Sequence, residues 1–196
     1  HQNFGPSQIR LQVVSDKIIR VQATAEQSFR NKQSLIIVPQ NSKANYKVEE
    51  QGDNLIITTA AMRAVMNEAT GQITFYDLKD NVLLNEVAQG GKTFKPFIVP
   101  DREIGVDIAK VPEAQKHGWS WRALFNSPDN EAFYGLGQHQ SEELNMKGKN
   151  EDLFQYNTKV SVPFVISNKN YGILWDSYSY CRWGNPEDYL QLNRAF

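Results

Sequence analysis

Four carboxylates that could act as general acids or bases lie in one polar stretch of the chain. They are Glu142, Glu143, Glu151 and Asp152. Two lysines, Lys147 and Lys149, lie between the two acidic pairs. Carboxylates that face each other across a cleft can transfer protons, but acids and lysines mixed along one polar stretch are more typical of a solvent-exposed loop. We therefore interpret these residues as surface charges and assign no catalytic residue.

Histidine and cysteine residues are few and far apart. The histidines are His1, His117 and His139, and Cys181 is the single cysteine. A zinc site needs several such ligands at characteristic spacing, and an internal disulfide needs a second cysteine. The sequence therefore suggests no metal site, no cofactor and no disulfide. We expect His117 and His139 to be ordinary polar residues with local hydrogen-bond partners.

The composition is that of a globular protein. The chain has 196 residues, of which 40% are hydrophobic and 22% charged, with a net charge of −1. This balance gives no electrostatic reason to expect binding to nucleic acid or to an anionic membrane, and no apolar run approaches the ~20 residues of a membrane span. The chain begins at His1 without methionine, so either a leading segment has been removed or the sequence is part of a longer protein. Its location is unknown, with export to the periplasm or cell surface as a working hypothesis.

Period-two alternation of apolar residues predicts an all-β fold. Turn signals recur about every 8–12 residues, the spacing expected of a sandwich or barrel. The clearest predicted strands are 9–13, 19–23, 35–38, 46–50, 55–59, 64–67, 72–76, 82–84, 119–125, 160–167 and 171–175. Between Gln89 and Gly118 the pattern is looser, with further strands suggested by apolar residues such as Phe94 and Ile108. One helix is expected, at Pro186–Phe196, where Asn185 can cap the first turn.

The strand at 160–167 has two notable features. Val160, Val162, Phe164 and Ile166 fall on one face of it, as the period of a strand requires. Pro163 lacks the N–H group that a central strand would donate, so the strand should be an edge strand or contain a bulge. Upstream, Gly135 and Gly137 suit a sharp bend beside a packed surface.

Three blocks in this part of the chain carry a family resemblance. Residues 133–138, 162–167 and 170–176 read FYGLGQ, VPFVIS and NYGILWD. In this order and spacing they resemble the N-terminal β-sandwich domain of family 31 glycoside hydrolases, and residues 19–22 and 70–75 extend the likeness upstream. The resemblance implies a galactose-mutarotase-like β-sandwich over residues 1–185. Residues 186–196 would then begin a linker or the next element, cut short at Phe196.

The resemblance also implies a function. The parent protein would be a retaining α-glycosidase, α-xylosidase-like or α-glucosidase-like, acting on an α-linked oligosaccharide. Its two catalytic aspartates lie on a (β/α)8 barrel that follows this domain in the family, and the chain shows no such alternation of strands and helices. The domain would brace the barrel and lend a loop to the substrate-binding mouth. Alone, we expect it to be inactive and to self-associate through the surface that the barrel covers.

Asn157 is the candidate substrate-proximal residue. In the family a short motif after the charged loop presents an aspartate to the bound sugar, and here the matching run is Phe154-Gln155-Tyr156-Asn157. Asparagine in place of aspartate changes a charged contact into a neutral one. The alternative is that Asn157 bonds the backbone of its own turn, and the residues leave both roles open.

Two other functions remain open from the sequence. A free-standing carbohydrate-binding module would expose a row of aromatic side chains, although we expect Trp119 and Trp121 to pack in the core. A mutarotase-like epimerase would bring His117 and His139 together with a carboxylate around one pocket. The polar loop 139–152 buries little by its composition, and it is predicted to be the most mobile internal segment.

Overall fold

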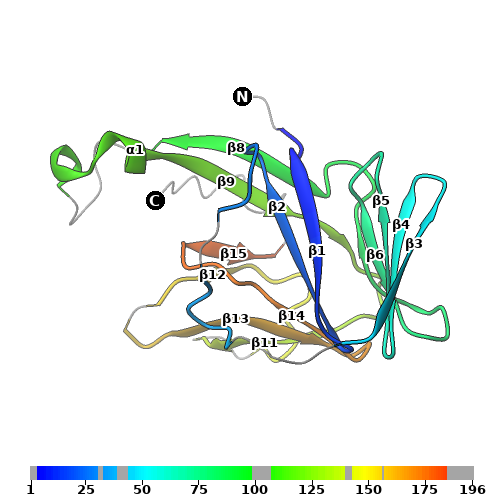
Figure 1. The fold of residues 1–196 in the computed structure, drawn as a ribbon. Coiled ribbons are helices and arrows are strands. Elements are labelled where there is room, and N and C mark those ends of the chain that lie inside the picture. The colour runs from blue at the N-terminus through cyan, green and yellow to red at the C-terminus, as the bar shows by residue number, and fades with distance from the viewer. Residues whose placement is uncertain are drawn as a thin grey trace. The chain divides into compact units, whose positions relative to one another are not determined.

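The computed structural model describes residues 4–30, 33–38, 44–98, 107–139, 143–155 and 157–184. Its regular structure is almost entirely β-strand, as predicted (Figure 1). The chain folds into two compact units. Within the described ranges, the first unit extends to Ser127 and the second begins at Pro128. Each unit has its own sheets and its own buried residues.

A six-stranded antiparallel sheet with strand order β10-β7-β6-β5-β4-β3 is the centre of the first unit. Its strands are β3 (Tyr46–Gln51), β4 (Asn54–Thr59), β5 (Arg63–Asn67), β6 (Ile73–Tyr76), β7 (Val82–Glu86) and β10 (Phe125–Asn126). Consecutive strands from β3 to β7 are neighbours because short turns connect them. Gly52 and Asp80 adopt φ values of 58° and 64° in two of these turns, a conformation that glycine and aspartate tolerate. The predicted hairpins in this region are confirmed.

Two further antiparallel ribbons belong to the first unit. β1 (Gln8–Ser15) pairs with β2 (Ile18–Thr24), as predicted, and β8 (Lys92–Ile98) pairs with β9 (His117–Ala123). Two short helices, η1 (Ile108–Lys110) and α1 (Glu113–Lys116), precede β9. The strand predicted through Ile108 is therefore wrong. A local hydrogen bond from Lys110 N to Asp107 O, 2.9 Å long, closes a helical turn there instead.

The apolar run at 35–38 was predicted to be a strand buried on both faces, and it is neither. Its first and last side chains are 79% and 74% exposed. The Ser34 hydroxyl oxygen accepts hydrogen bonds from the backbone N–H groups of Ile36 and Ile37. This local turn uses donors that a strand ladder would need, so an apolar run alone did not identify a strand.

The tryptophans of β9 also differ from prediction. Trp119 and Trp121 are 38% and 43% exposed, whereas Phe94, on the paired strand β8, is buried. The ring of Phe94 packs against both tryptophan rings. The two tryptophan rings therefore cover Phe94 and are themselves partly exposed to solvent. Contact with the smaller Phe94 ring leaves part of each tryptophan ring uncovered.

The second unit contains a three-stranded sheet and a two-stranded ribbon. In the sheet, β13 (Val160–Ser167) lies between β11 (Phe133–Gln138) and β14 (Tyr171–Leu174). The ribbon pairs β12 (Glu151–Leu153) with β15 (Cys181–Trp183). The buried cluster of this unit comprises Phe133, Leu136, Met146 and Val165, with Leu153, Tyr171, Ile173 and Trp183 packed against it. The hairpin predicted from 160 to 175 is confirmed.

Pro163 lies in the central strand of this sheet. On one side of it Val165 pairs with Gly135, on the other Ser161 pairs with Gly137, and the register shifts in between. Since proline has no N–H group to donate, it is tolerated where the ladder is interrupted. Of the two predicted roles for this position, edge strand or bulge, the bulge is confirmed.

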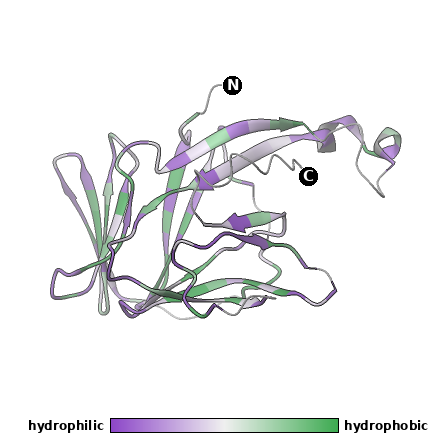
Figure 2. Ribbon diagram, turned by 180° about the vertical axis from the view of Figure 1, so that it is seen from behind, coloured by the Kyte–Doolittle hydropathy of each residue, from purple (hydrophilic) through white to green (hydrophobic). Residues whose placement is uncertain are grey.

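The two faces of the three-stranded sheet differ in an unexpected way. On β13, Val165 and Ser167 are buried, while the side chains of the opposite face, Val160, Val162, Phe164 and Ile166, are exposed and all apolar. Together with neighbours on β11 and β14 they form an outer face, which consists of Tyr134, Val160, Val162, Phe164, Ile166 and Leu174. Figure 2 shows the hydrophobic colouring along β13. A half-buried strand normally turns its apolar side chains inward and polar ones outward. Here Val165 belongs to the buried cluster, yet the exposed side chains of β13 are apolar as well.

Some predictions concern residues outside the described ranges. They include the helix at Pro186–Phe196 and the domain boundary after residue 185. Within the described part of the chain, no helix has the length and apolar character needed to cross a membrane.

Candidate functional site

Asn157 lies in the turn between β12 and β13, and it is exposed. The Gln155 side chain holds this turn: its Nε2 donates to Lys159 O at 3.0 Å, and its Oε1 accepts from Ser161 N at 3.0 Å. Thr158 has a φ of 71°, which completes the turn. Among the described residues, none forms a hydrogen bond with the Asn157 amide. The turn is fixed by other residues and presents this amide to solvent.

A buried polar cluster adjoins this turn. Glu151 Oε2 lies 2.9 Å from Lys159 Nζ and 3.1 Å from His139 Nδ1. His139 Nε2 donates to Leu136 O at 2.6 Å, because a carbonyl oxygen can only accept. All three charged or polar side chains are largely buried. The His139 Nδ1 atom is sealed from solvent and is not aligned for a hydrogen bond, so its contact with Glu151 is one of proximity only.

Asp152, the other acid of this pair, is also engaged. Its Oδ1 accepts a hydrogen bond of 2.5 Å from the Tyr180 hydroxyl and lies 3.3 Å from Arg182 Nε. Partial burial, and then the hydrogen bond to Asp152, raise the pKa of the Tyr180 phenol. The interpretation as solvent-exposed loop charges is therefore wrong for Glu151, whose side chain is only 16% exposed, whereas the Asp152 side chain remains 47% exposed. Both residues lie in β12 rather than in a loop.

The remaining acids of the polar stretch behave as predicted or cannot be described. Glu143 forms an ion pair with Lys149 at the surface, and Glu142 lies outside the described residues. Glu131, which the sequence did not single out, is instead buried and accepts hydrogen bonds of 2.6 Å from Ser167 Oγ and from the Tyr171 hydroxyl. Burial, and then this bond, raise the pKa of Tyr171. These contacts tie the loop before β11 to β13 and β14.

The described part of the loop 139–152 is better anchored than its composition suggests. Met146 is buried in the core of the second unit. Its backbone N–H donates to Phe133 O at 2.7 Å, and its carbonyl accepts from Trp183 Nε1 at 3.0 Å. The expectation that this loop buries little is wrong at Met146. Residues 140–142 lie outside the described ranges, and the mobility of the loop stays a prediction.

Each of the two internal histidines has its own carboxylate. His117 Nε2 lies 3.0 Å from Glu113 Oε1 at the exposed surface of the first unit, and His139 belongs to the buried cluster of the second unit. Neither unit contains both histidines. Within each unit, therefore, the residues described do not assemble the paired histidines of a mutarotase-like centre.

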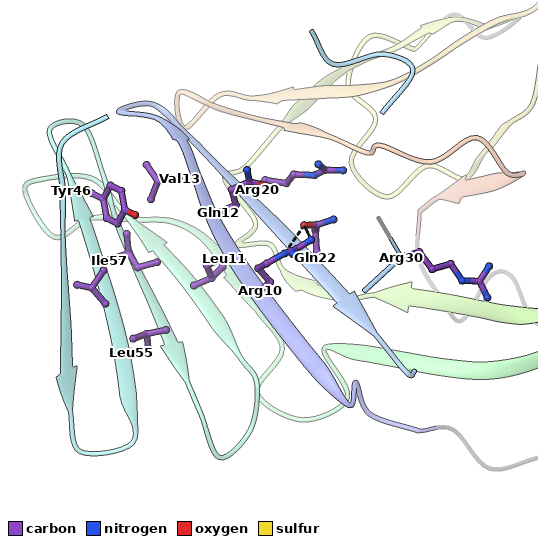
Figure 3. A pocket seen from close by; sticks show the side chains of 11 residues that line it. Arg10, Leu11, Gln12, Val13, Arg20, Gln22, Arg30, Tyr46, Leu55 and Ile57 are labelled. Carbon is purple, nitrogen blue, oxygen red and sulfur yellow. Dashed lines mark hydrogen bonds between the residues drawn. The ribbon is translucent and has the colours of Figure 1, made fainter. Parts of the chain in front are cut away.

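A groove of the first unit lies between β1–β2 and β3–β4 (Figure 3). It has a volume of about 650 Å³ and an apolar floor that includes Leu11 and Ile57. Arg10 at its rim donates to Gln22 Oε1 and lies over the Phe29 ring, 4.4 Å from the centroid. The described residues that line the groove include no carboxylate and no histidine, the side chains that most often serve as general acid or base.

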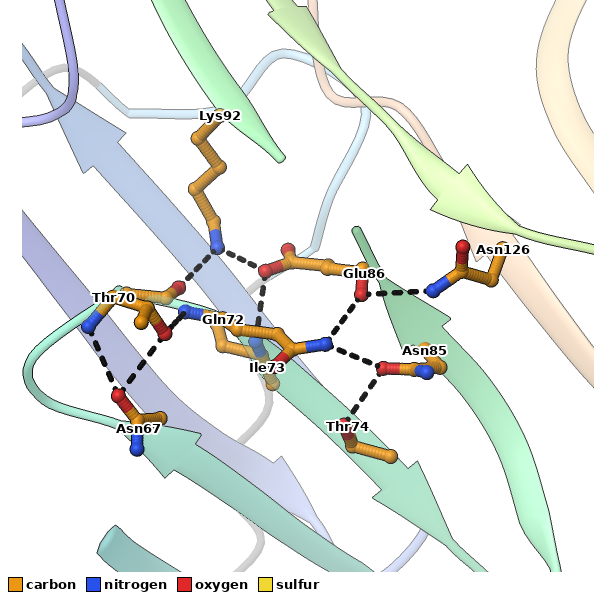
Figure 4. A network of polar contacts seen from close by, with 10 residues as sticks. Asn67, Thr70, Gln72, Ile73, Thr74, Asn85, Glu86, Lys92 and Asn126 are labelled. Atoms are coloured by element: carbon orange, nitrogen blue, oxygen red, sulfur yellow. Dashed lines mark hydrogen bonds and ion pairs between the residues drawn. The ribbon is translucent and has the colours of Figure 1, made fainter. Parts of the chain in front are cut away.

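A second, smaller cavity of about 250 Å³ adjoins a buried ion pair. Glu86 and Lys92 contact each other, and both side chains are 5% exposed. Glu86 Oε2 also accepts from Ile73 N at 2.8 Å, and Lys92 Nζ donates to Gly71 O at 2.9 Å (Figure 4). Burial raises the pKa of Glu86, against the opposing effect of Lys92. Among the described residues there is no cluster of three or more His, Cys, Asp or Glu able to hold a metal ion.

These observations define the class of the protein as an all-β protein. A sequence model of the glycosyl hydrolase 31 N-terminal galactose mutarotase-like domain matches residues 8–183. The chain belongs to this family of N-terminal domains. The predicted fold class, a galactose-mutarotase-like β-sandwich, is thereby confirmed.

Similar proteins are much longer than this chain. A family 31 glucosidase of Pseudescherichia vulneris, described as uncharacterized, is 26% identical over 178 residues, which cover 86% of this chain and 32% of that protein. An α-xylosidase of Saccharolobus solfataricus is 25% identical over 186 residues, which cover 90% of this chain and 23% of that protein. The chain therefore spans about a quarter to a third of these relatives.

Two solved structures of family 31 α-xylosidases are also similar to this chain, and they too are much longer. The family 31 α-xylosidase of Xanthomonas citri superposes with a TM-score of 0.79 at 37% identity, over 94% of this chain and 19% of that one. A family 31 α-xylosidase from a soil metagenome, complexed with xylose, gives a TM-score of 0.70 at 26% identity, over 89% of this chain and 26% of that one.

Proposed function

We propose that the chain is the non-catalytic N-terminal domain of a retaining α-xylosidase and that it braces the catalytic barrel of the same polypeptide. Its similarity to two solved family 31 α-xylosidases supports the xylosidase assignment. The family resemblance supports the retaining mechanism, in which one carboxylate attacks the sugar and another acts as acid and then base. Both carboxylates would come from the barrel.

The observation that carries this proposal is the outer face of the three-stranded sheet. Its side chains are mainly aliphatic, which suits burial against another protein surface. Val162 and Ile166 are exposed there while Ser167, a polar residue of the same strand, is buried. Burial of apolar area contributes about 25 cal/mol per Å². A strand that turns its apolar side chains outward is therefore best explained by a protein partner that covers them.

The proposed contribution to the substrate mouth rests on the Asn157 turn. The Gln155 side chain, at the start of this turn, bonds Lys159 O and Ser161 N at its end, so hydrogen bonds within the chain hold the turn. The Asn157 amide is exposed and can donate to one sugar oxygen while accepting from a sugar hydroxyl. An α-linked oligosaccharide in the barrel would be its partner.

The test compares the protein encoded by the complete gene with the 196-residue chain. We expect the longer protein to hydrolyse p-nitrophenyl α-D-xyloside with retention of anomeric configuration, followed by NMR of the first product, and the chain alone to hydrolyse nothing. Preference of the longer protein for the α-D-glucoside would change the substrate class. Turnover that co-purifies with the chain alone through successive columns would refute the non-catalytic role.

A further inference from the structure

One face of the β8–β9 ribbon carries a cluster of aromatic rings. Phe94 is at its centre, with the Trp121 ring stacked on it at 6.1 Å and an interplanar angle of 13°. The Trp119 ring meets Phe94 edge-on at 6.4 Å and 89°. Phe4, which forms a β-bridge with Phe94, meets Trp119 edge-on at 6.3 Å. The two tryptophan rings are therefore roughly perpendicular to each other and form a corner.

The outer members of this cluster remain accessible. Phe4, Trp119 and Trp121 are 43%, 38% and 43% exposed. Aromatic groups bring a large apolar area together with a ring face of defined geometry, and exposed apolar groups that cluster mark binding surfaces. The cluster differs in chemistry from the outer face of β13, where aliphatic side chains predominate. The cluster is therefore suited to a ligand that stacks on aromatic ring faces.

Phe4 connects this cluster to the cavity beside Glu86 and Lys92, because its ring belongs to the cluster and the residue is one of those that line the cavity. Lys92 is two residues before Phe94 on β8, so the two side chains are on the same face of the strand. Thr70, Gln72 and Thr93 add further polar groups to the cavity wall. Aromatic rings and a polar cavity thus adjoin each other within the first unit.

The cavity contains an unused hydrogen-bond acceptor. Glu86 Oε2 takes the contacts from Lys92 and Ile73, whereas Glu86 Oε1 receives no hydrogen bond from any residue that the structure describes. This oxygen is not among the sealed polar atoms that lack a partner, so it reaches the cavity that Glu86 lines. Because this oxygen is accessible, it can accept a hydrogen bond from water or from the hydroxyl group of a ligand.

We propose that this surface binds a neutral oligosaccharide, with one pyranose ring in the cavity and the next over the tryptophan corner. A sugar ring has an apolar C–H face, which stacks on aromatic rings, and a rim of hydroxyl groups, which suits Glu86 Oε1 and Lys92 Nζ. The cavity is smaller than the ~300–1,000 Å³ of a pocket for a drug-sized ligand, and so fits a single ring. An anion is disfavoured by the carboxylate, and an apolar protein segment would leave its oxygen without a partner. The inference takes its class of ligand from the proposed function but needs no catalysis.

The test uses the 196-residue chain and two probes, isomaltotriose and a β-1,4-glucan oligosaccharide with α-xylosyl branches. Binding is measured by isothermal titration calorimetry and by tryptophan fluorescence. We expect binding of at least one probe at millimolar concentration, weakened at least about 10-fold by Trp119→Ala and by Trp121→Ala, equivalent to ~1.4 kcal/mol. Trp119→Phe should retain intermediate affinity, and Glu86→Gln should weaken binding while keeping the side-chain shape.

Tyr178→Ala is the matched control, since Tyr178 is an aromatic residue of the second unit with 48% exposure. It should leave affinity unchanged, and the circular dichroism melting curve of each variant shows whether it folds. Absence of binding to both probes, or binding that neither tryptophan variant weakens, would overturn the proposal. A change of sedimentation behaviour in the tryptophan variants without a change in sugar binding would also overturn it, since it would show a protein contact. Because catalysis is not measured, failure here leaves the proposed hydrolase function intact.

Discussion

Met146 shows at the scale of a single residue how a polar stretch can still be structural. Its neighbours in sequence, Asn145 and Lys147, are polar, and nothing in the local pattern identifies it as a core residue. Yet its side chain is buried with Phe133, and the Asn145 side-chain oxygen accepts a hydrogen bond from Phe133 N at 3.0 Å. The loop after β11 is therefore anchored by one apolar side chain and one amide.

Replacing this anchor should destabilise the fold. Met146→Ala removes a buried side chain and leaves a cavity, which typically costs about 2–5 kcal/mol of unfolding free energy. Leu144→Ala, two positions earlier, is the control, because Leu144 is 83% exposed and exposed substitutions usually change stability by less than about 0.5 kcal/mol. Urea denaturation of both variants measures the difference. Equal stability of the two would show that Met146 is not an anchor in solution.

Asn157 is the residue for which we propose a contact with substrate. If the proposed function holds, Asn157→Ala in the longer protein should raise KM about 2- to 10-fold, the effect of losing one neutral hydrogen bond of ~0.5–1.5 kcal/mol. Asn157→Asp, which supplies the carboxylate implied by the family resemblance, should lower KM. Asn130→Ala is the control at another exposed turn asparagine. Steady-state kinetics on an α-xyloside measure the KM of each variant. An unchanged KM for Asn157→Ala would show that Asn157 does not contact the substrate.

At the scale of the element, turns carry most of the predictive information. The turn between β6 and β7 is an example, because Asp77 Oδ1 accepts from Lys79 N at 2.8 Å and from Asn81 N at 2.9 Å. Side-chain bonds of this kind make aspartate a turn former. Such turns fix which strands are neighbours, which is why the hairpins from β3 to β7 were predictable. The run at 35–38 was predicted to be a strand from its apolar residues alone, without a turn of this kind to define its neighbours, and that prediction was wrong.

The Asp77 turn also gives a pH-dependent prediction. The hydrogen bond from the Asn81 side chain, with those from the turn backbone, lowers the pKa of Asp77 below its ordinary value of 3.8. A carboxylate with a lower pKa in the folded state adds stability that is present above its ordinary pKa and is lost as the pH falls through the lowered one. Asp77→Ala should therefore melt below the parent chain at neutral pH.

The melting temperatures of Asp77→Ala and of the parent chain should converge as the pH falls through the lowered pKa of Asp77. Asp129→Ala, at an exposed aspartate, should match the parent chain at every pH. Thermal melts followed by circular dichroism across an acid series make the comparison. A constant difference between Asp77→Ala and the parent at all pH values would show that the charge of Asp77 does not stabilise the turn.

At the scale of the whole molecule, the fold class was predictable and the candidate sites were not. Alternation and turn spacing require only the sequence, and they identified an all-β protein. The cluster of His139, Glu151 and Lys159 joins residues separated in the chain, and the exposure of Trp119 depends on which surfaces are covered. Periodicity indicates which side chains share a face, but it does not show whether that face is covered. For β13 it identified the apolar set correctly, and only the structure showed that this set is exposed.

The outer face of β13 predicts the behaviour of the isolated chain. With Ile166 and its neighbours exposed, we expect association that increases with protein concentration in sedimentation velocity. Ile166→Glu should keep the chain monomeric, at a cost to stability below about 1 kcal/mol, the span of strand propensities. Val82→Glu, at a residue of β7 that is 46% exposed, is the control and should associate like the parent. A parent chain that stays monomeric at high concentration would contradict the prediction.

The glycines of β11 have a consequence for how such chains are recognised. A Cβ atom at Gly137 would lie 2.0 Å from Val160 O, and one at Gly135 would lie 2.6 Å from Phe164 O. Their φ values of 95° and 128° are strained for any other residue. Both glycines are thus required by the close antiparallel pairing of β11 with β13, independently of any ligand. The FYGLG motif therefore indicates common ancestry and carries no information about ligand specificity. Functional labels transferred on that motif alone should stop at the family, and the choice of sugar has to be read from residues that are free to vary.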